Sequence, residues 1–338
     1  MARNSFTFQD FRQARCFVRL IFKEYGKAGG EVGHIVFGED MLGVKTENNV
    51  LFIEGNNSEV DKWKERYENF KPTEREFEYY YPCWSIYGPL RDSKIIVGGY
   101  SILPCENQED YPRTGKLIVA LTFKVKAYDE SEALEIGYFE VRKILPIIST
   151  LLGVWMGPIE RAVSGMRLTS IGSLNPEGIH YKILKNTTEF SGDSKGWRKI
   201  DVAKARNLFS RYSELPKPKK ERFESACRAY NLAQQFSGIY PGLGGGCLRS
   251  CLDTLTYGKA RNVLKVKYKE GKLYSDISNV FHNDIIPEHS IKHFMGQTEF
   301  ELFPEKHIED ANRFKKRKWR LYDIVHQEIE EFLIGHTG

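Results

Sequence analysis

The densest cluster of cationic side chains in the sequence lies near the C-terminus, at residues 313–320. It contains six Lys or Arg residues and two aromatic residues among eight positions. Cations attract the phosphates of nucleic acids without reading their sequence, and Trp319 can stack on a base or anchor a helix in the core. The alternative is a solvated helix face that later glutamates balance. The predicted nucleic-acid-binding residues are Arg313, Lys315, Lys316, Arg317, Lys318 and Trp319.

The remaining polar motifs lead us to expect neither a metal ion nor a nucleotide cofactor. Cys247 and Cys251 stand one helical turn apart, as do His289 and His293, but two ligands do not complete a zinc site and no Cys-x-x-Cys pair is present. The glycine-rich segment 238–246 is followed by Cys247, whereas a P-loop requires Lys and then Ser or Thr. We interpret this segment as a loop between two helices.

A metal-dependent DNA endonuclease of the restriction type would need an acidic residue and an acid-x-Lys triplet on neighbouring strands. Triplets with this spacing occur at residues 92–94, 193–195 and 270–272. None lies well inside a predicted strand, although the first leads into one. This activity therefore remains an alternative that the spacing alone does not favour.

Two kinds of element must position these residues, because strand patterns dominate the first half of the chain and helical patterns the second. In residues 116–126, apolar side chains alternate with mainly polar ones, as in a strand with one buried face. Short β-branched and aromatic runs predict further strands at residues 16–23, 34–37, 50–54, 94–103, 166–171 and 179–184. Helical patterns predict helices at residues 58–70, 129–152, 201–215, 219–236, 247–257 and 307–333.

The length of 338 residues favours two domains. The polar segment 186–197, which contains Gly and Ser, is the best candidate for a linker. We therefore predict an α+β protein. Its first domain, residues 1–190, is expected to be a strand-rich α/β recognition or binding domain, and its second, residues 200–338, an all-α helical domain.

The composition excludes several classes of protein. Hydrophobic residues make up 41% and charged residues 28% of the chain, which is typical of a soluble folded protein. The 50 Lys and Arg residues against 45 Asp and Glu residues leave a net charge of +5, which does not identify a partner. No apolar run predicts a transmembrane helix or a signal peptide, and six cysteines do not form a disulfide framework in a chain of this length. We expect a cytoplasmic protein without a membrane partner.

Three segments in the C-terminal third of the chain share the apolar patterning of a known family. They are the helices 222–233 and 247–255 and the segment 273–282, which ends in His282. Their order resembles the HEPN superfamily, especially the larger prokaryotic defence-associated proteins in which a strand-bearing domain precedes a helical HEPN domain. The segment 273–282 is similar to the active-site helix of that family.

The resemblance implies metal-independent cleavage of RNA by an Arg and a His that are separated by four to six residues, usually across a dimer. In such a site the His arranges proton transfer from the ribose 2′-hydroxyl and the Arg stabilises phosphate charge. The segment before His282 departs from this pattern, because Ile277 stands where the Arg is expected. The required spacing is found instead in Arg320 and His326. The candidate catalytic residues are therefore Arg320, His326 and His282.

Three functions stay open, and the sequence does not decide whether the chain is an enzyme. The first is a nucleic-acid-binding protein of a prokaryotic defence or toxin type, with RNA rather than DNA as partner and with RNA cleavage if the helical domain is catalytic. The second is a non-catalytic scaffold that holds protein or nucleic acid in a larger complex. The third is a metal-dependent DNA endonuclease. A protein partner or a homodimer is compatible with the first two.

Overall fold

The computed structural model describes residues 2–26, 33–37, 40–85, 93–106, 117–158, 183–184, 186–190, 201–236, 241–277 and 304–335. The chain consists of two compact units. Unit 1 consists of Met1–Tyr79 and Lys124–Phe139, and unit 2 consists of Tyr80–Phe123 and Glu140–Gly338. Helices and strands occur together, which confirms the predicted α+β class in this broad sense.

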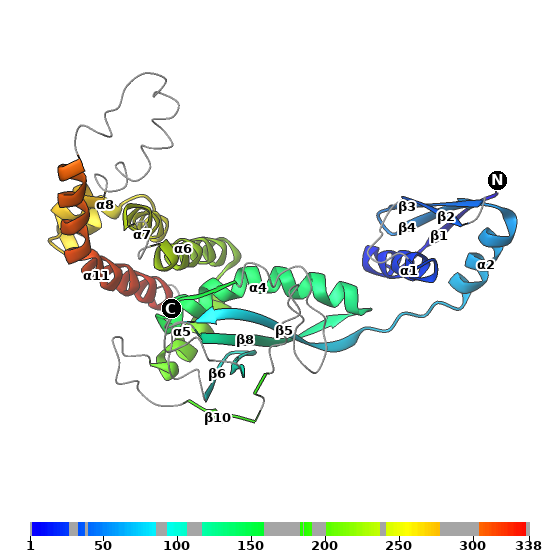
Figure 1. Cartoon of the computed structure of the whole chain (residues 1–338), viewed down its shortest axis with the longest axis horizontal. Helices are drawn as coiled ribbons and strands as arrows, with labels where there is room; N and C mark the ends of the chain where they lie inside the picture. Colours follow the sequence, from blue (N-terminus) through cyan, green and yellow to red (C-terminus); the bar gives the residue numbers. More distant parts are fainter. Residues whose placement is uncertain are drawn as a thin grey trace, which may run out of the picture. The chain divides into compact units, whose positions relative to one another are not determined.

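Unit 1 contains an antiparallel sheet and two helices (Figure 1). Its elements are β1 (Ala2–Thr7), α1 (Phe11–Glu24), β2 (Gly33–Phe37), β3 (Asp40–Glu47), β4 (Val50–Gly55) and α2 (Asn57–Glu68). The strand order is β1-β4-β3-β2. Both helices contribute to one hydrophobic core, in which the buried rings of Phe17 and Trp63 lie 5.8 Å apart. The strands predicted at 34–37 and 50–54 and the helix predicted at 58–70 are confirmed.

The strand predicted at residues 16–23 is wrong, because these residues belong to α1. The Asp10 side chain accepts a hydrogen bond from the Gln13 backbone N–H at 2.8 Å and so caps the helix. Phe17 and Ile21, one turn apart, are both completely buried. A segment of only eight residues that is rich in apolar side chains fits either the helical or the strand period, so the capping residue Asp10 is the better indicator.

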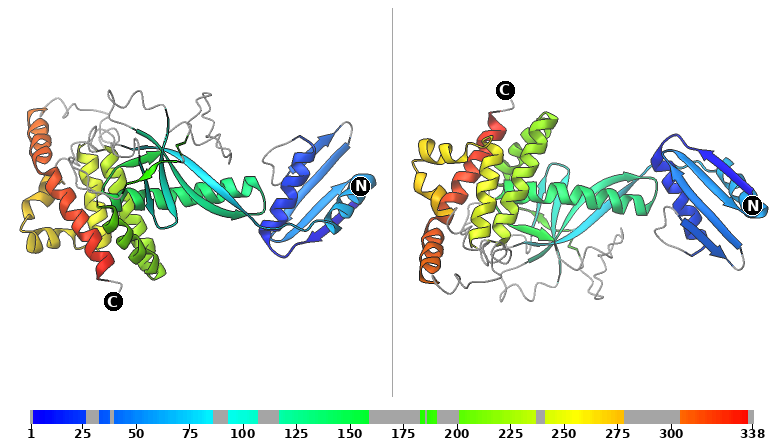
Figure 2. Two further views of the ribbon diagram at one scale, coloured as in Figure 1. Left: turned by 90° about the horizontal axis from the view of Figure 1, so that it is seen from below. Right: turned by 90° about the horizontal axis from the view of Figure 1, so that it is seen from above.

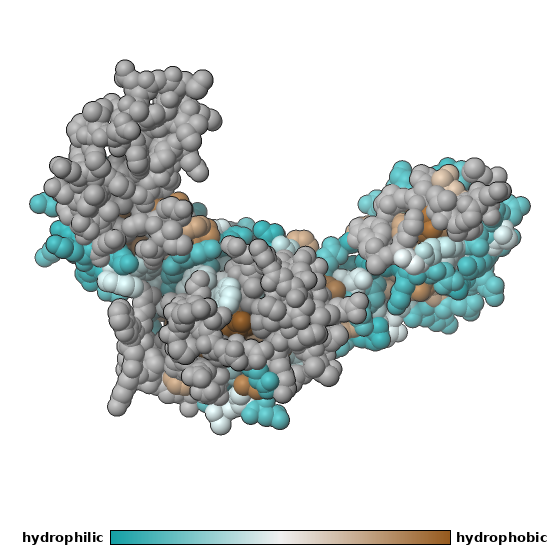
Figure 3. Space-filling view, in the orientation of Figure 1, coloured by the Kyte–Doolittle hydropathy of each residue, from teal (hydrophilic) through white to brown (hydrophobic). Residues whose placement is uncertain are grey.

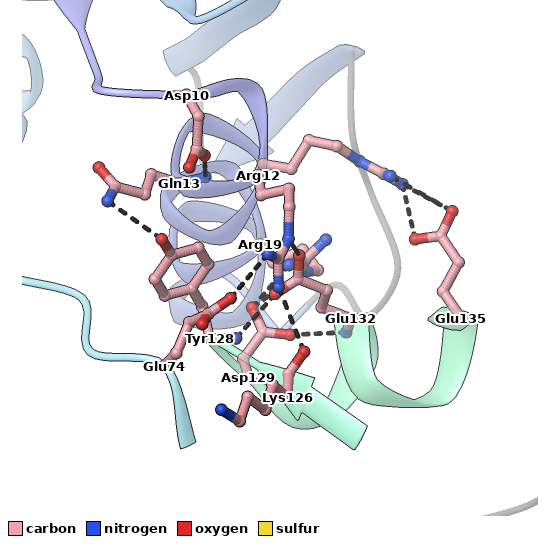
Figure 4. Close-up of polar contacts among 11 residues, drawn as sticks. Asp10, Arg12, Gln13, Arg19, Glu74, Lys126, Tyr128, Asp129, Glu132 and Glu135 are labelled. Carbon is pink, nitrogen blue, oxygen red and sulfur yellow. Dashed lines mark hydrogen bonds and ion pairs between the residues drawn. The ribbon is translucent and has the colours of Figure 1, made fainter. Parts of the chain in front are cut away.

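Within unit 1, three arginines of α1 face carboxylates at the start of α4 (Glu130–Leu152) (Figure 4). The ion pairs are Arg12–Glu132, Arg15–Glu135 and Arg19–Asp129. Asp129 also accepts a hydrogen bond from the Glu132 backbone N–H at 2.8 Å, which caps α4. The junction between α1 and α4 is therefore held by charged groups.

We expect this junction to make unit 1 sensitive to acid. Burial pushes the pKa of Asp129 upward, but hydrogen bonds from the Glu132 backbone and from Arg19 outweigh it and hold the pKa below its ordinary value. A carboxylate whose pKa is lower in the folded state adds stability above its unfolded-state pKa and loses it as pH falls through the folded-state value. Asp129→Asn, which keeps the cap, should therefore lower the free energy of unfolding at neutral pH.

Urea unfolding at a series of pH values tests this expectation. The difference in the free energy of unfolding between wild type and Asp129→Asn should begin to shrink as the pH falls below about 4, the ordinary pKa of Asp, and should vanish once the pH is below the lower pKa of the folded wild-type carboxylate. If the difference in the free energy of unfolding between the two proteins stays constant from neutral to acidic pH, the charge on Asp129 does not stabilise the junction.

A six-stranded sheet belongs mainly to unit 2, and its strand order is β10-β6-β7-β8-β5-β9. The strands are β5 (Arg75–Ser85), β6 (Ser93–Val97), β7 (Tyr100–Pro104), β8 (Leu117–Ala127), β9 (Met156–Pro158) and β10 (Thr188–Glu189). β8 confirms the strand predicted at 116–126. The single strand predicted at 94–103 is wrong, because β6 and β7 form an antiparallel hairpin. The predicted strand 166–171 and most of 179–184 lie outside the described residues.

The hairpin turn depends on Gly98, and replacing this glycine by alanine should destabilise unit 2. Gly98 has φ +60°, and a Cβ there would lie 2.4 Å from the ring of Phe209. We expect Gly98→Ala to lower the free energy of unfolding by about 1–3 kcal/mol, because the added methyl group causes backbone strain and overcrowding. Urea unfolding measures this change. Gly99→Ala is the matched control, since nothing lies within 4 Å of a Cβ at that position. If Gly98→Ala and Gly99→Ala lower the free energy of unfolding equally, the turn does not depend on Gly98.

The second half of unit 2 is helical. Its elements are α5 (Val202–Glu214), α6 (Lys217–Phe236), α7 (Pro241–Leu255), α8 (Ala260–Asn262), the π-helical turn η2 (Val263–Lys267) and α11 (Pro304–Ile334). α6 and α7 lie side by side, and α11 packs against α7 and α5 (Figure 2). The helices predicted at 201–215, 219–236 and 307–333 are confirmed. None of the described helices is both long and apolar enough to cross a membrane.

The loop predicted at 238–246 is wrong for residues 241–246, which form the first turns of α7. Glycine lowers helix stability by about 1 kcal/mol per residue relative to alanine, so the composition alone disfavours this helix. Burial of Leu248, Cys251 and Leu252 along the rest of α7 explains why a helix forms here.

The domain boundary predicted near residues 190–200 falls within unit 2. The described residues on either side of it contact the same sheet. β10 pairs with β6, and Arg206 of α5 donates a hydrogen bond to the Ile96 carbonyl oxygen at 2.7 Å and pairs with Glu189. The helices from α5 onward and the larger sheet therefore belong to one unit.

Candidate functional site

The basic cluster 313–320 lies on the N-terminal half of α11, and the structure describes its side chains from Lys316 onward. Lys316 and Arg317 are exposed, Lys318 is half-buried and Trp319 is 50% exposed. Arg313 and Lys315 belong to the same helix, but their side chains lie outside the described part. The described members of the cluster are thus accessible to a ligand.

Arg317 meets a second group of cations from an earlier part of the chain. Together they line an open pocket of about 540 Å³, which we call the basic pocket. Its charged lining residues are Arg261, Lys265, Lys269, Glu270, Lys272 and Arg317. Five cations thus face one carboxylate, which gives the pocket a strong excess of positive charge.

The two lysines of the turn η2 have different surroundings, because Lys267 pairs with α11 whereas Lys265 lines the basic pocket. Lys267 and Tyr268 contact Glu328 of α11, with 2.7 Å between the Tyr268 hydroxyl and the carboxylate. Partial burial works against the charge of Lys267, but hydrogen bonds to Glu328 and Glu331 outweigh it and raise the pKa of the lysine. This contact fastens η2 to α11. Lys265 lines the basic pocket and remains exposed.

Two arginines of α11 are held at this pocket by single carboxylates. Arg317 lies 2.9 Å from Asp276, and Arg320 lies 3.6 Å from Glu270 in the pocket wall. Exposed ion pairs of this kind contribute about 0–1 kcal/mol. A phosphate can therefore replace either carboxylate as partner at little cost. The surface at the left-hand edge of the view, where α8 lies, is mainly hydrophilic (Figure 3).

A second pocket of about 540 Å³ lies along the C-terminal half of α11, and we call it the His326 pocket. Leu151 and Leu152 supply apolar lining, and Tyr230 and Tyr322 supply two buried rings. The ring centres of Tyr230 and Tyr322 are 5.6 Å apart, and that of His326 lies 6.2 Å from Tyr230. The other polar lining residues are Asp201, Lys204, Asp323, His326, Gln327 and Glu330.

His326 is oriented by a carboxylate. Its Nδ1 lies 3.1 Å from Oε1 of Glu330, whose other partner is the ammonium group of Lys204 at 2.5 Å. Burial raises the pKa of Glu330, but hydrogen bonds from His326 and Lys204 outweigh it, and the pKa lies below its ordinary value. Glu330 therefore stays ionised and fixes one imidazole nitrogen. Such an arrangement suits a group that accepts or donates a proton through the other nitrogen, Nε2.

The predicted pair Arg320 and His326 is divided between the two pockets. Successive residues of an α-helix are about 100° apart, so a separation of six places the two side chains about 120° apart around α11. Arg320 accordingly pairs with Glu270 of the basic pocket, while His326 lines the other pocket. His282 lies outside the described residues.

Four cations of residues 261–272 line the basic pocket but were not predicted from the sequence. Residues 259–272 contain six Lys or Arg residues, a density that marks a second basic segment. They are interspersed with apolar residues such as Leu264, which is buried, so the segment does not form an uninterrupted run. The acid-x-Lys triplet at 270–272 lies in the wall of the basic pocket and not in a strand.

Cys247 and Cys251 of α7 are packed thiols. Cys247 is half-buried and Cys251 fully buried, neither forms a disulfide, and burial raises the pKa of both. Among the described residues, no group of three or more His, Cys, Asp or Glu side chains is placed to hold a metal ion.

Searches against protein-family models, curated proteins and solved structures found no match.

Proposed function

We propose that this chain is a nucleic-acid-binding protein of a prokaryotic defence or toxin type, in which the helices after β10 bind the phosphate backbone of RNA. The basic pocket carries the proposal. It brings Arg317, which belongs to the cluster predicted at 313–320, next to four cations of residues 261–272. In this proposal those helices form a HEPN-like helical part, and the sheets serve as the recognition or binding part.

The shape and chemistry of the basic pocket support a polyanion rather than a small cofactor. The pocket is open, its lining is mostly charged, and its lysines are exposed. The excess of exposed cations suits the repeated charges of a phosphate backbone. Lys side chains act as point charges toward phosphates, while Arg261 and Arg317 offer planar forks that hold two phosphate oxygens.

A direct test compares two ligands that differ in backbone charge. Fluorescence anisotropy should show binding of the intact chain to a labelled single-stranded RNA and little binding to a peptide nucleic acid of the same base sequence, which carries no phosphates. Equal affinity for the two would overturn the proposal.

Metal-independent RNA cleavage is a second candidate function, favoured by the fixed His326–Glu330 pair. We expect cleavage in EDTA to fall by about 10²–10⁴-fold in His326→Ala, the usual contribution of a general acid or base. Arg320→Ala and His282→Ala test the other two candidate residues. If wild type does not cleave, or if His326→Ala and His282→Ala both cleave normally, this function is excluded, and RNA binding without turnover would assign the chain as a non-catalytic scaffold.

A further inference from the structure

The His326 pocket has a charge opposite to that of the basic pocket. Three carboxylates, of Asp201, Asp323 and Glu330, face the single ammonium group of Lys204. A phosphate group is therefore less favoured here than in the basic pocket, where five cations face one carboxylate. The pocket therefore suits a ligand, or a part of one, that is uncharged or cationic and that donates hydrogen bonds.

Of these carboxylates, that of Asp323 is available to a ligand. Asp201 caps α5 by accepting the Lys204 backbone N–H at 2.8 Å, and Glu330 is held by His326 and Lys204. Asp323 is exposed, and no hydrogen bond or ion pair joins it to another residue in the described part of the chain. Its two oxygens can accept two neighbouring donors at once.

Planar groups stand on either side of Asp323 along α11. Trp319 precedes it by four residues and His326 follows it by three, so the three side chains share one face of the helix. Trp319 is 50% exposed and the His326 side chain 28% exposed. The half-buried His326 ring lines the pocket, and the exposed Trp319 ring precedes Asp323 by one helical turn. Each ring offers a surface on which a flat ligand can stack, and base–aromatic stacking contributes about 1–3 kcal/mol per base.

We propose that this face of α11 binds an unpaired guanine base, with Asp323 accepting the two donors of its Watson–Crick edge. Among the four RNA bases, guanine alone presents two adjacent donors there, N1–H and the 2-amino group. Adenine and cytosine each place an acceptor beside one amino donor, and uracil has a single N–H between two carbonyl oxygens. The pocket of about 540 Å³ is within the usual range for a small ligand.

The site differs from the phosphate-binding surface proposed above and does not depend on it. A free nucleoside lacks phosphate, so its binding tests the carboxylate and the rings alone. A guanine within single-stranded RNA presents the same edge, and its phosphates can continue toward the cationic face of α11, which carries Arg317 and Arg320.

Isothermal titration with guanosine, inosine and adenosine tests the proposal. Inosine lacks the 2-amino group, so it should bind at least roughly tenfold more weakly than guanosine, the usual effect of losing one hydrogen bond to a charged group. Asp323→Asn should lose guanosine binding to a similar extent. Asp61→Asn, at an exposed position of α2, is the matched control and should bind as wild type does.

A second arm uses short single-stranded RNAs in which one guanine is replaced by inosine. Binding of guanosine itself identifies a nucleoside site, and preference for guanine confined to the oligonucleotides identifies a base-reading site within RNA. Both results support the proposal. It is overturned if neither guanosine nor a guanine-containing RNA is preferred over its inosine counterpart, or if Asp323→Asn retains the preference. Lys265→Glu/Lys272→Glu should still bind guanosine, which separates this result from failure of the phosphate surface.

Discussion

Replacing Lys265 and Lys272 by glutamate is expected to weaken the binding of single-stranded RNA by roughly 25-fold at about 0.1 M salt. Each phosphate contact to a single strand contributes about 0.7 to the slope of log K against log salt, so each of the two contacts is worth about fivefold at this salt concentration. The introduced glutamates also repel the phosphates, which adds to this loss of RNA affinity. Both side chains are exposed and line the basic pocket, so the change leaves the core intact.

The matched control reverses two charges elsewhere. Lys64 and Lys71 are exposed in unit 1, and the double change to glutamate alters the net charge by the same amount. We expect this control to bind RNA within about twofold of wild type, since neither Lys64 nor Lys71 lines the basic pocket. Equal loss in the two double variants would mean that net charge, and not the basic pocket, determines RNA binding.

Phe223→Ala is expected to lower the free energy of unfolding of unit 2 by about 3–5 kcal/mol, because the ring is removed from a closed core. Phe223 is completely buried, and its ring stacks on Phe332 of α11 at 6.0 Å and contacts Tyr212 of α5 at 5.6 Å. The side chain thus joins α5 and α6 to the helix that carries both pockets.

Urea unfolding measures this loss, and Leu232→Ala on the same helix provides the control. Leu232 is 42% exposed, so its truncation should cost less than about 1 kcal/mol. If the two variants are equally stable, Phe223 does not hold the helices together. Where Phe223→Ala still folds, weaker RNA binding would show that the docking of α11 supports the basic pocket.

Helices and strands could be predicted from the sequence where the period of their hydrophobic residues is clear or a helix-capping residue lies nearby. The β8 strand and the helices α5, α6 and α11 have such patterns, and Asp129 lies at the start of the helix predicted at 129–152 and caps α4. Residues 16–23 and 241–246 could not be assigned correctly, because a short apolar run or a glycine run has no local preference strong enough to decide. Their helices are settled by burial against distant elements.

The site could be predicted only in part. The cluster 313–320 identified Arg317, but its neighbours in the basic pocket come from residues 261–272, and no local pattern indicates that these two segments meet. The division between Arg320 and His326 follows from helical geometry once the helix is known to be continuous. A spacing of six residues satisfies a motif while directing the two side chains to different pockets.

The salt dependence of RNA binding by the intact wild-type chain tests the central claim most directly. If all five cations of the basic pocket contact phosphates, log K for single-stranded RNA should fall against log salt with a slope of about −3.5, and Lys265→Glu/Lys272→Glu should reduce this slope by about 1.4. A wild-type slope near zero, or the same slope in both proteins, would contradict the account.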